Sequence, residues 1–365
     1  MAEPTLLTPA AAPESGVQDA LDRMVAQGVP GVLLRHSADG AETVLRSGVA
    51  DLRTGAEFPA GARWRIASLT KSVTAVAALQ LVARGLLDLD RPLAEVLPGR
   101  IPDAAGITAR RLLQHTSGLY NYTDSAGFRF PADYVHRPFT PAELVDIAVE
   151  HGPVAPPGRG WGYSNTNYAL LGMIVEELTG EPLPETFRRR VFAPLSMGDS
   201  HLPVHEPRIG GPHPTGHHLL PESTGDPERH PLTEYDPSFA WAAYGVVSST
   251  ADVNRFYRGL FRGELLPRDL VEEMLRAVPT GDPVFGGYGL GLEELRLTCG
   301  IRMWGHCGGI PGFSAYAFST PDGREQVSLA LNLFVVGRRS VPFIYTAADA
   351  VNRAVCGEPY PRPGE

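Results

Sequence analysis

The chain has 365 residues, of which 43% are hydrophobic and 20% are charged, values typical of a globular protein without general disorder. Its net charge of −9 argues against nucleic acid or an anionic membrane surface as the main partner. No apolar run approaches the roughly 20 residues that span a bilayer. The first residues, MAEPTLLTPAAAPESG, lack the basic start and apolar core of a secretory leader. We expect a cytoplasmic protein if Met1 is the natural start, and a secreted one if Met1 precedes a mature chain.

The first part of the chain predicts a helix, two strands and a second helix. SGVQDALDRMVAQGVPG has apolar residues on one side and a glycine stop, as an amphipathic helix does. GVLLRHS and AETVLRSGVADL predict two strands joined by the turn SADG. A strongly apolar helix is then predicted from Ser68 to Arg84, ended by Gly85.

Helices dominate the middle of the chain, and strands return near its end. We predict helices at Thr108–Gln114, Pro141–Glu150, Asn167–Thr179, Ala251–Arg262 and Pro267–Ala277. The segment from about Gly198 to Pro237 is dense in proline, glycine and histidine and predicts an irregular loop. Strands are expected at YGLGLEEL, IRMWGHCGG, FSAYAFS and QVSLALNLF, and a last helix at about Val341–Ala354.

Strands at both chain ends, with helices between them, predict an α/β protein of the α+β type. Strands joined by short turns pair antiparallel, so we expect one antiparallel sheet built from both termini and flanked by the terminal helices. The rest would form an all-helical subdomain. This gives one catalytic domain over residues 1–365, with a sheet subdomain at about 14–70 and 285–356, a helical subdomain at about 71–284, and a site in the cleft between them.

Cysteine and histidine usage gives no clear metal site, and we expect no metal and no cofactor. An odd number of cysteines without a C-x-x-C pair excludes the common zinc patterns; they are Cys299, Cys307 and Cys356. Four histidines lie in the proline-rich segment: His213, His217, His218 and His230. A metal site there stays open, although solvated loop histidines are the simpler interpretation.

Lys71 is the only lysine, whereas the other 31 of the 32 basic residues are arginines. Arginine stays protonated, but a buried lysine can lose its proton and act as a general base. Ser68 lies three residues earlier, on the same face of the predicted helix, where a nucleophile would meet its base. The alternative is a surface lysine in a chain depleted of lysine for other reasons.

Two further short motifs follow Ser68-x-x-Lys71. Tyr163 and Asn165 lie in GWGYSNTNY, before a predicted helix, and His306 lies in MWGHCGGIPGF, on a predicted strand. Each is weak alone. In this order they resemble the penicillin-recognising serine enzymes, namely class C β-lactamases and D-alanyl-D-alanine carboxypeptidases, with histidine where many members have Lys-Thr-Gly. The resemblance extends through GVADLRTG, QHTSGLYNYTD, VSSTADV and YGLGL, and is closest to the secreted bacterial D-alanyl-D-alanine carboxypeptidases.

The resemblance implies the β-lactamase/transpeptidase-like fold and an acyl intermediate on Ser68. Lys71 and Tyr163 are both candidate proton acceptors, and we expect the phenol beside the ammonium to favour its phenolate form. Asn165 would orient Lys71 and hold the substrate amide. His306 would complete a cationic wall.

The substrate-binding residues are likewise implied by the resemblance. The N–H groups of Ser68 and Gly309 would form the oxyanion hole, and Gly308 and Gly309 would let the substrate backbone approach closely. Trp241 matches a position where the family lines its cleft with an aromatic residue, although a core tryptophan is an equal alternative.

We therefore expect a serine hydrolase or acyltransferase acting on amide or ester bonds of D-amino-acid-containing peptides. The partners would be a small peptide or acyl substrate and, as covalent ligands, β-lactams; the protein would be a monomer. The alternatives are a biosynthetic acyltransferase or peptide cyclase, an esterase, a β-lactamase, or a penicillin-binding sensor that acylates without turnover.

Good carboxypeptidase activity is not expected despite the resemblance. The family's carboxypeptidases place an arginine and a threonine where this chain has Glu293 and Gly309. A carboxylate at that place would repel a substrate carboxylate and suit an ammonium group. If the alignment were shifted by a few residues, Arg296 or Arg302 would enter the cleft instead.

The resemblance also implies that Cys299 and Cys356 are close, because secreted relatives have a disulfide here. In cytosol the two cysteines would stay reduced, and the bridge would not form. Cys307 would be unpaired in either case.

Overall fold

The computed structural model describes residues 12–102, 104–220, 228–335 and 337–362. In these ranges the main sheet has eight strands in the order β2-β1-β12-β11-β10-β9-β8-β7, with neighbours antiparallel throughout. Their bounds are β1 Gly31–Ala38, β2 Ala41–Gly48, β7 Val278–Pro279, β8 Gly287–Tyr288, β9 Glu293–Arg296, β10 Arg302–Ile310, β11 Phe313–Ser319 and β12 Glu325–Leu331. The predicted sheet from both chain ends is confirmed, since β1 pairs with β12.

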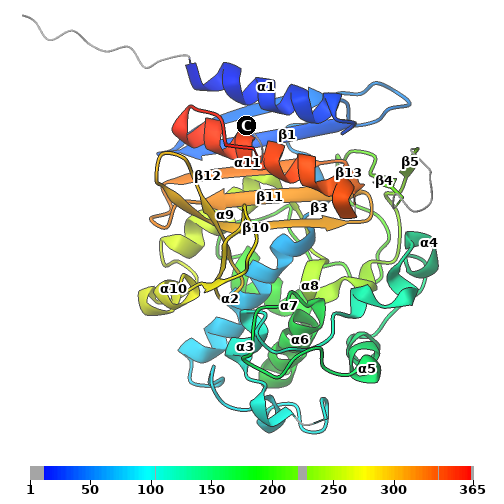
Figure 1. The fold of residues 1–365 in the computed structure, drawn as a ribbon, viewed down its shortest axis with the longest axis vertical. Helices are drawn as coiled ribbons and strands as arrows, with labels where there is room; N and C mark the ends of the chain where they lie inside the picture. The colour runs from blue at the N-terminus through cyan, green and yellow to red at the C-terminus, as the bar shows by residue number, and fades with distance from the viewer. Residues whose placement is uncertain (1–11, 103, 221–227, 336, 363–365) are drawn as a thin grey trace, which may run out of the picture.

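Two hydrophobic cores lie on opposite faces of this sheet. Helices α1 (Ala12–Ala26) and α11 (Val341–Cys356) pack side by side on one face (Figure 1). Along β1, Val32 and Leu34 belong to the core beneath these helices, whereas Leu33 belongs to the core on the other face. Successive side chains of a strand point to opposite faces, so the fully buried start of β1 is apolar on both faces.

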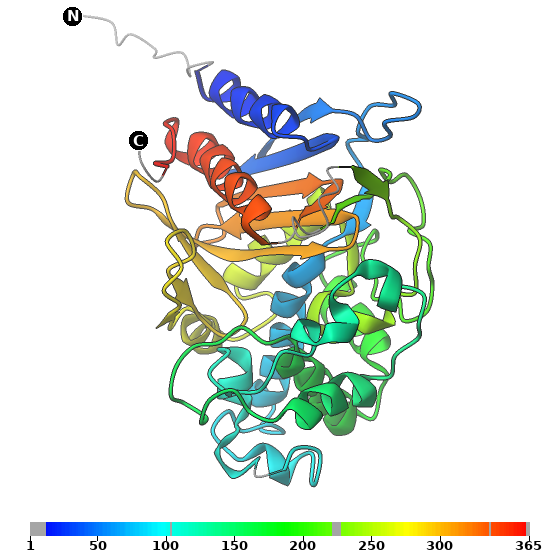
Figure 2. The same ribbon diagram turned by 45° about the vertical axis from the view of Figure 1, so that its right-hand side comes forward.

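Helix α2 (Thr70–Ala83) is the centre of the second core and leads from the sheet into the helical part (Figure 2). It ends before Gly85, whose φ of +70° suits glycine. Around and beyond it lie α3 Ala109–Leu113, α4 Pro131–Tyr134, α5 Pro141–His151, α6 Asn165–Thr179, α7 Leu183–Phe187, α8 Trp241–Tyr244, α9 Thr250–Phe261 and α10 Arg268–Met274. Two short strands, β3 Arg63–Arg65 and β6 Val247–Ser249, pair beside it.

The structure corrects the expectation of an irregular loop from Gly198 to Pro237. The strands β4 (His217–Leu219) and β5 (Arg229–Pro231) pair with each other, and β4 also pairs with β13 (Leu333–Val335). The part of this segment at 221–227, and the N-terminal residues 1–11 on which the leader was judged, lie outside the described residues.

The pairing of β4 also decides the state of two histidines. His217 and His218 are buried rather than solvated, and burial lowers the pKa of His218 to about 4. The exposed His213 matches the expectation. Among the described residues no group of three or more histidine, cysteine, aspartate or glutamate side chains could hold a metal ion. No helix in the described ranges is both long and apolar enough to cross a membrane.

The predicted disulfide is present. Cys299, just before β10, is bonded to Cys356 at the end of α11, with a Cα–Cα distance of 5.7 Å. Cys307 is free, as expected. The bridge fastens the last helix to the strand that lines the candidate site.

Candidate active site

Ser68 lies in a short 3₁₀ turn, Ala67–Leu69, directly ahead of α2. Ala67 has a φ of +50°, a conformation that costs energy for any residue with a side chain and that persists where surrounding packing enforces it. On its other side Ser68 meets strand β10: a Cβ atom at Gly308 would lie 2.4 Å from the Ser68 nitrogen. Only glycine at 308 lets the strand approach the serine this closely.

Lys71 is completely buried beneath Ser68. Its Nζ donates to Asn165 Oδ1 at 2.7 Å, to the Ala243 carbonyl oxygen at 3.0 Å and to Ser68 Oγ at 3.1 Å. Loss of solvation holds the Lys71 pKa well below that of a free lysine. The only lysine is thus no surface residue, and a neutral amine here could accept the Ser68 proton.

Tyr163 contacts the same serine from the opposite side. Its hydroxyl donates to Ser68 Oγ at 2.8 Å, and Lys71 Nζ lies 4.7 Å from the centre of its ring. Loss of solvation raises the Tyr163 pKa well above its usual value. The expectation of a favoured phenolate is therefore wrong, because the cost of burying the anion exceeds the stabilisation by the hydrogen bond with Ser68.

Asn165 begins helix α6 and connects Lys71 to the helical part. While its Oδ1 accepts from Lys71, its Nδ2 donates to Thr123 Oγ1 at 3.1 Å and its backbone N–H donates to Asn121 Oδ1 at 2.9 Å. These bonds fix both ends of the amide, so its oxygen faces the lysine. The structure thereby brings Ser68, Lys71, Tyr163 and Asn165 into one hydrogen-bonded group.

His306 does not form a cationic wall. It is completely buried in β10, and its Nε2 lies 2.9 Å from the Tyr288 hydroxyl. Burial and the nearby Lys71 lower the His306 pKa to about 3, so the ring is neutral at ordinary pH. It is also absent from the residues that line the cavity above Ser68. The expected positive charge is absent because His306 is buried against Tyr288, where no water could solvate a charged ring.

The glycines after His306 lie at an open edge of the sheet. Pairing of β10 with β9 ends at Gly305, and the backbone N–H of Cys307 points to this side, where it donates to Glu293 Oε2 at 2.7 Å. Alternate residues of a strand direct their N–H groups to the same side, so the N–H of Gly309 faces the cleft beside Ser68. This geometry suits an oxyanion-hole donor.

Glu293 lines the cavity at the expected place. It is 8% exposed, its Oε1 lies 3.5 Å from His306 Nδ1, and burial raises its pKa to about 8. The expected negative charge at this place is therefore largely absent near neutral pH, because burial favours the protonated carboxyl. Arg296 and Arg302 do not enter the cleft, because their side chains are 74% and 63% exposed and both pair with Glu294.

Trp241 is a core residue, in agreement with the alternative interpretation. It is 4% exposed, and a Cβ atom at Gly172 in α6 would lie 2.7 Å from its ring. It does not line the cavity, whereas Tyr244, three residues later on α8, does.

His115, which was not predicted as a site residue, is buried and holds the turn bearing Tyr163. Its ring centre lies 4.4 Å from that of Tyr163. Its Nδ1 accepts from the Ser164 N–H at 3.1 Å and lies 3.0 Å from Asn167 Nδ2. Its φ is +58°, and burial together with Lys71 lowers its pKa well below the usual range. Nothing in the local pattern QHTSGL reveals these contacts.

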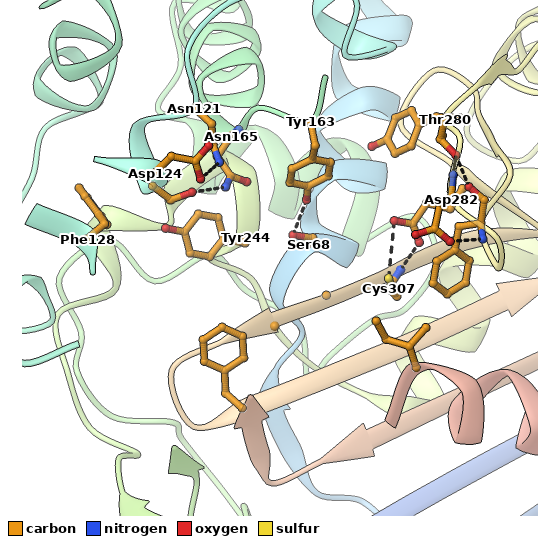
Figure 3. Close-up of a pocket in the computed structure, with 18 of the residues that line it drawn as sticks. Ser68, Asn121, Asp124, Phe128, Tyr163, Asn165, Tyr244, Thr280, Asp282 and Cys307 are labelled. Carbon is orange, nitrogen blue, oxygen red and sulfur yellow. Dashed lines mark hydrogen bonds between the residues drawn. The ribbon is translucent and has the colours of Figure 1, made fainter. Parts of the chain in front are cut away.

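The cavity above Ser68 has a volume of about 520 Å³, and its ionisable lining is mainly acidic. Three acidic side chains, Asp124, Asp282 and Glu293, line it, and no lysine or arginine is among its described lining residues. Ser68 and Tyr163 lie between Asp124 on one side and Asp282 on the other (Figure 3). Aromatic rings form much of the remaining wall: Phe128, Tyr134, Trp161, Tyr244, Phe285, Tyr288 and Phe334.

A serine that shares hydrogen bonds with a buried lysine and a tyrosine, beside an open strand edge, defines a serine acyl-transfer site. Residues 17–348, most of the chain, match the Beta-lactamase family model. The chain belongs to this family.

Similar proteins include a curated relative and solved structures. Penicillin-binding protein 4 of Amycolatopsis lactamdurans is 35% identical over 63% of this chain, and the match spans only 59% of that relative. A D-stereospecific amidohydrolase from Streptomyces sp. is 33% identical with a TM-score of 0.85, over 94% of this chain and 99% of that one. The D-amino acid amidase from Ochrobactrum anthropi SV3, in complex with D-phenylalanine, is 30% identical with a TM-score of 0.83, over 94% of this chain and 98% of that one.

Proposed function

We propose that this protein hydrolyses amides of D-amino acids that carry a free α-ammonium group and no carboxylate beyond the scissile bond. The observation that carries the proposal is the cavity itself, which presents three acidic side chains and no described cationic side chain. At low effective dielectric a carboxylate near a substrate carboxylate costs energy, whereas the same group near an ammonium gains it. Near neutral pH this effect comes from Asp124 and Asp282, because Glu293 keeps its proton to about pH 8. The similarity to a D-stereospecific amidohydrolase and a D-amino acid amidase supports this choice.

The reaction would begin with neutral Lys71. Its Nζ takes the Ser68 Oγ proton as Oγ bonds to the substrate carbonyl carbon, while the N–H groups of Ser68 and Gly309 hold the developing oxyanion. The C–N bond then breaks, Tyr163 gives its proton to the leaving nitrogen, and Lys71 returns a proton to Tyr163. Water hydrolyses the acyl-serine by the same proton path. The lowered Lys71 pKa and the raised Tyr163 pKa favour lysine as the base.

The test compares four substrates by mass detection of products. These are D-phenylalanine amide, L-phenylalanine amide, N-acetyl-D-phenylalanine amide and a peptide that ends in D-Ala-D-Ala. We expect the first to have the highest kcat/KM, and acetylation to lower kcat/KM roughly tenfold because it removes the charge that the carboxylates attract. Faster release of D-alanine from the free-acid peptide would contradict the proposal, whereas a gain of that activity in Glu293→Arg would support it.

A persistent adduct would identify the sensor alternative. β-Lactams are proposed to acylate Ser68, and intact-mass measurement after incubation with penicillin would detect the adduct. A hydrolase releases product repeatedly from an activated ester, whereas a sensor gives one burst and stops. Supply of an amine acceptor in the same assay distinguishes acyl transfer, through the mass of the new amide. The expected monomer stays a prediction for size-exclusion chromatography.

A further inference from the structure

A second cavity, of about 190 Å³, lies on the face of the sheet that carries α11. Its walls come from separate elements that meet behind strand β10. Tyr316 is on β11, Leu331 is on β12, Leu333 and Val335 are on β13, and Phe343 is on α11. The cavity is thus a gap between the sheet and the start of its last helix.

This cavity adjoins the active-site cavity. Phe334 and Ile344 line both of them, as do Cys307 and the two following glycines of β10. A Cβ atom at Gly309 would lie 2.2 Å from the Phe334 ring, whereas one at Gly308 would meet Ser68. The missing side chains of the two glycines therefore leave room on opposite faces of the strand, for Ser68 at Gly308 and for Phe334 at Gly309. The second cavity thus lies directly across β10 from the nucleophile.

The lining of the second cavity is apolar. No charged side chain is among its described lining residues. The hydroxyl of Ser314 donates to the Leu333 carbonyl oxygen and that of Ser340 to the Gly337 carbonyl oxygen, each at 2.7 Å. The Tyr316 hydroxyl and the Cys307 thiol are the other side-chain polar groups in the lining. A space with so few polar partners holds water poorly and favours an apolar occupant.

We propose that the second cavity is a subsite for an apolar substituent of the substrate, an alkyl or aryl group of several carbon atoms. The substituent would belong either to the acyl part or to the leaving amine, and would enter past Phe334 and Ile344. That the scissile bond is an amide rests on the proposed function, whereas the preference for an apolar substituent rests only on the lining of the second cavity. A substrate that fills the cavity gains from each methylene group removed from water.

The experiment measures kcat/KM in two substrate series. The amine series uses D-phenylalanine amides of ammonia, methylamine, propylamine and butylamine. The acyl series uses p-nitrophenyl acetate, butyrate and hexanoate, which any acyl-serine enzyme can report. We expect a rise of about fourfold per buried methylene in at least one series. Val335 lines the second cavity but not the first, so Val335→Trp should fill the second cavity alone. In this variant kcat/KM should no longer rise along that series, whereas kcat/KM for the smallest substrate should change less than twofold.

Val154→Trp is the matched control, because Val154 is 67% exposed and should leave both series unchanged. Melting temperatures verify that the variants fold, and Phe343→Trp replaces Val335→Trp if the latter does not. Two flat series in the wild type, or a rising series that survives filling of the cavity, would overturn the subsite. Absence of D-amide turnover with a rising ester series would overturn only the proposed function.

Discussion

At the residue scale, the hydrogen bonds that join Ser68, Lys71 and Tyr163 determine the chemistry. The ammonium form of Lys71 has acceptors for all of its protons, yet burial disfavours the charge. The same burial keeps Tyr163 protonated. A neutral amine and a neutral phenol thus share one serine oxygen, so that one group can take a proton while the other gives one.

Lys71→Arg should reduce kcat nearly as much as Ser68→Ala, roughly 10³-fold or more, because arginine cannot release its proton. The measurement is turnover of D-phenylalanine amide, or of p-nitrophenyl acetate, by variants whose melting temperatures show that they are folded. An active Lys71→Arg enzyme would show that the lysine supplies charge rather than a proton acceptor.

Glu293 predicts a dependence of stability on pH. In the unfolded chain a glutamate loses its proton near pH 4.5, whereas the folded protein holds it to about pH 8. Between these values the unfolded state binds fewer protons, so Glu293 makes the protein less stable as pH rises. Glu293→Gln keeps an acceptor for the Cys307 N–H and removes this loss.

We therefore expect the melting temperature of Glu293→Gln, relative to the wild type, to increase from pH 5 to pH 8 and then level off. Differential scanning calorimetry across this range provides the measurement, with Glu57→Gln at a side chain that is 84% exposed as the control. A difference that is constant with pH would contradict the buried, protonated state.

At the scale of elements, the disulfide joins two parts that lie far apart in sequence. It closes a loop of 57 residues between β10 and the end of α11. In the chain-entropy model such a loop contributes about 4 kcal/mol. For a protein of this size, the paired variant Cys299→Ser with Cys356→Ser should melt roughly 5 °C lower. Peptide mapping that links Cys307 to either partner would contradict the pairing.

The elements also show how far a sequence can be interpreted. Alternating or continuous apolar runs predicted the sheet strands, because the period of two reflects which faces are buried. The predicted strand YGLGLEEL is nevertheless interrupted between β8 and β9, where Gly291 has a φ of +79°. The predicted strand QVSLALNLF is divided between β12 and β13 near Asn332, whose side chain bonds the backbone of three other segments. Such long-range bonds have no local signal.

The same limit applies to the site. The motifs predicted the grouping of Ser68, Lys71, Tyr163 and Asn165, because each is tied to its neighbours by short spacing or by the family pattern. The neutral state of His306 and the core position of Trp241 depend on what covers them from other elements. Burial determines protonation here, and burial is a property of the assembled fold.

At the scale of the whole molecule, charge and architecture act together. The chain carries a net charge of −9, and three carboxyl side chains line the cavity. Charges on a surface and along a cleft add to one field, and a low-dielectric wall concentrates it. Glu293 adds little to this field below pH 8, where it keeps its proton. The net charge and the other acidic groups of the cleft should nevertheless draw a cationic substrate toward Ser68 and repel a carboxylate-bearing peptide.

This field predicts a salt dependence that differs between substrates. Raising ionic strength from 0.01 to 1 M shortens the Debye length from about 30 to about 3 Å. We expect kcat/KM for D-phenylalanine amide, measured well below the pKa of its amine, to fall roughly threefold to tenfold. The neutral p-nitrophenyl acetate should be nearly unaffected, and Asp124→Asn should weaken the dependence for the amide alone. Equal loss with both substrates would mean that salt acts on the enzyme rather than on the attraction, and the acidic cavity would then not select the ammonium group.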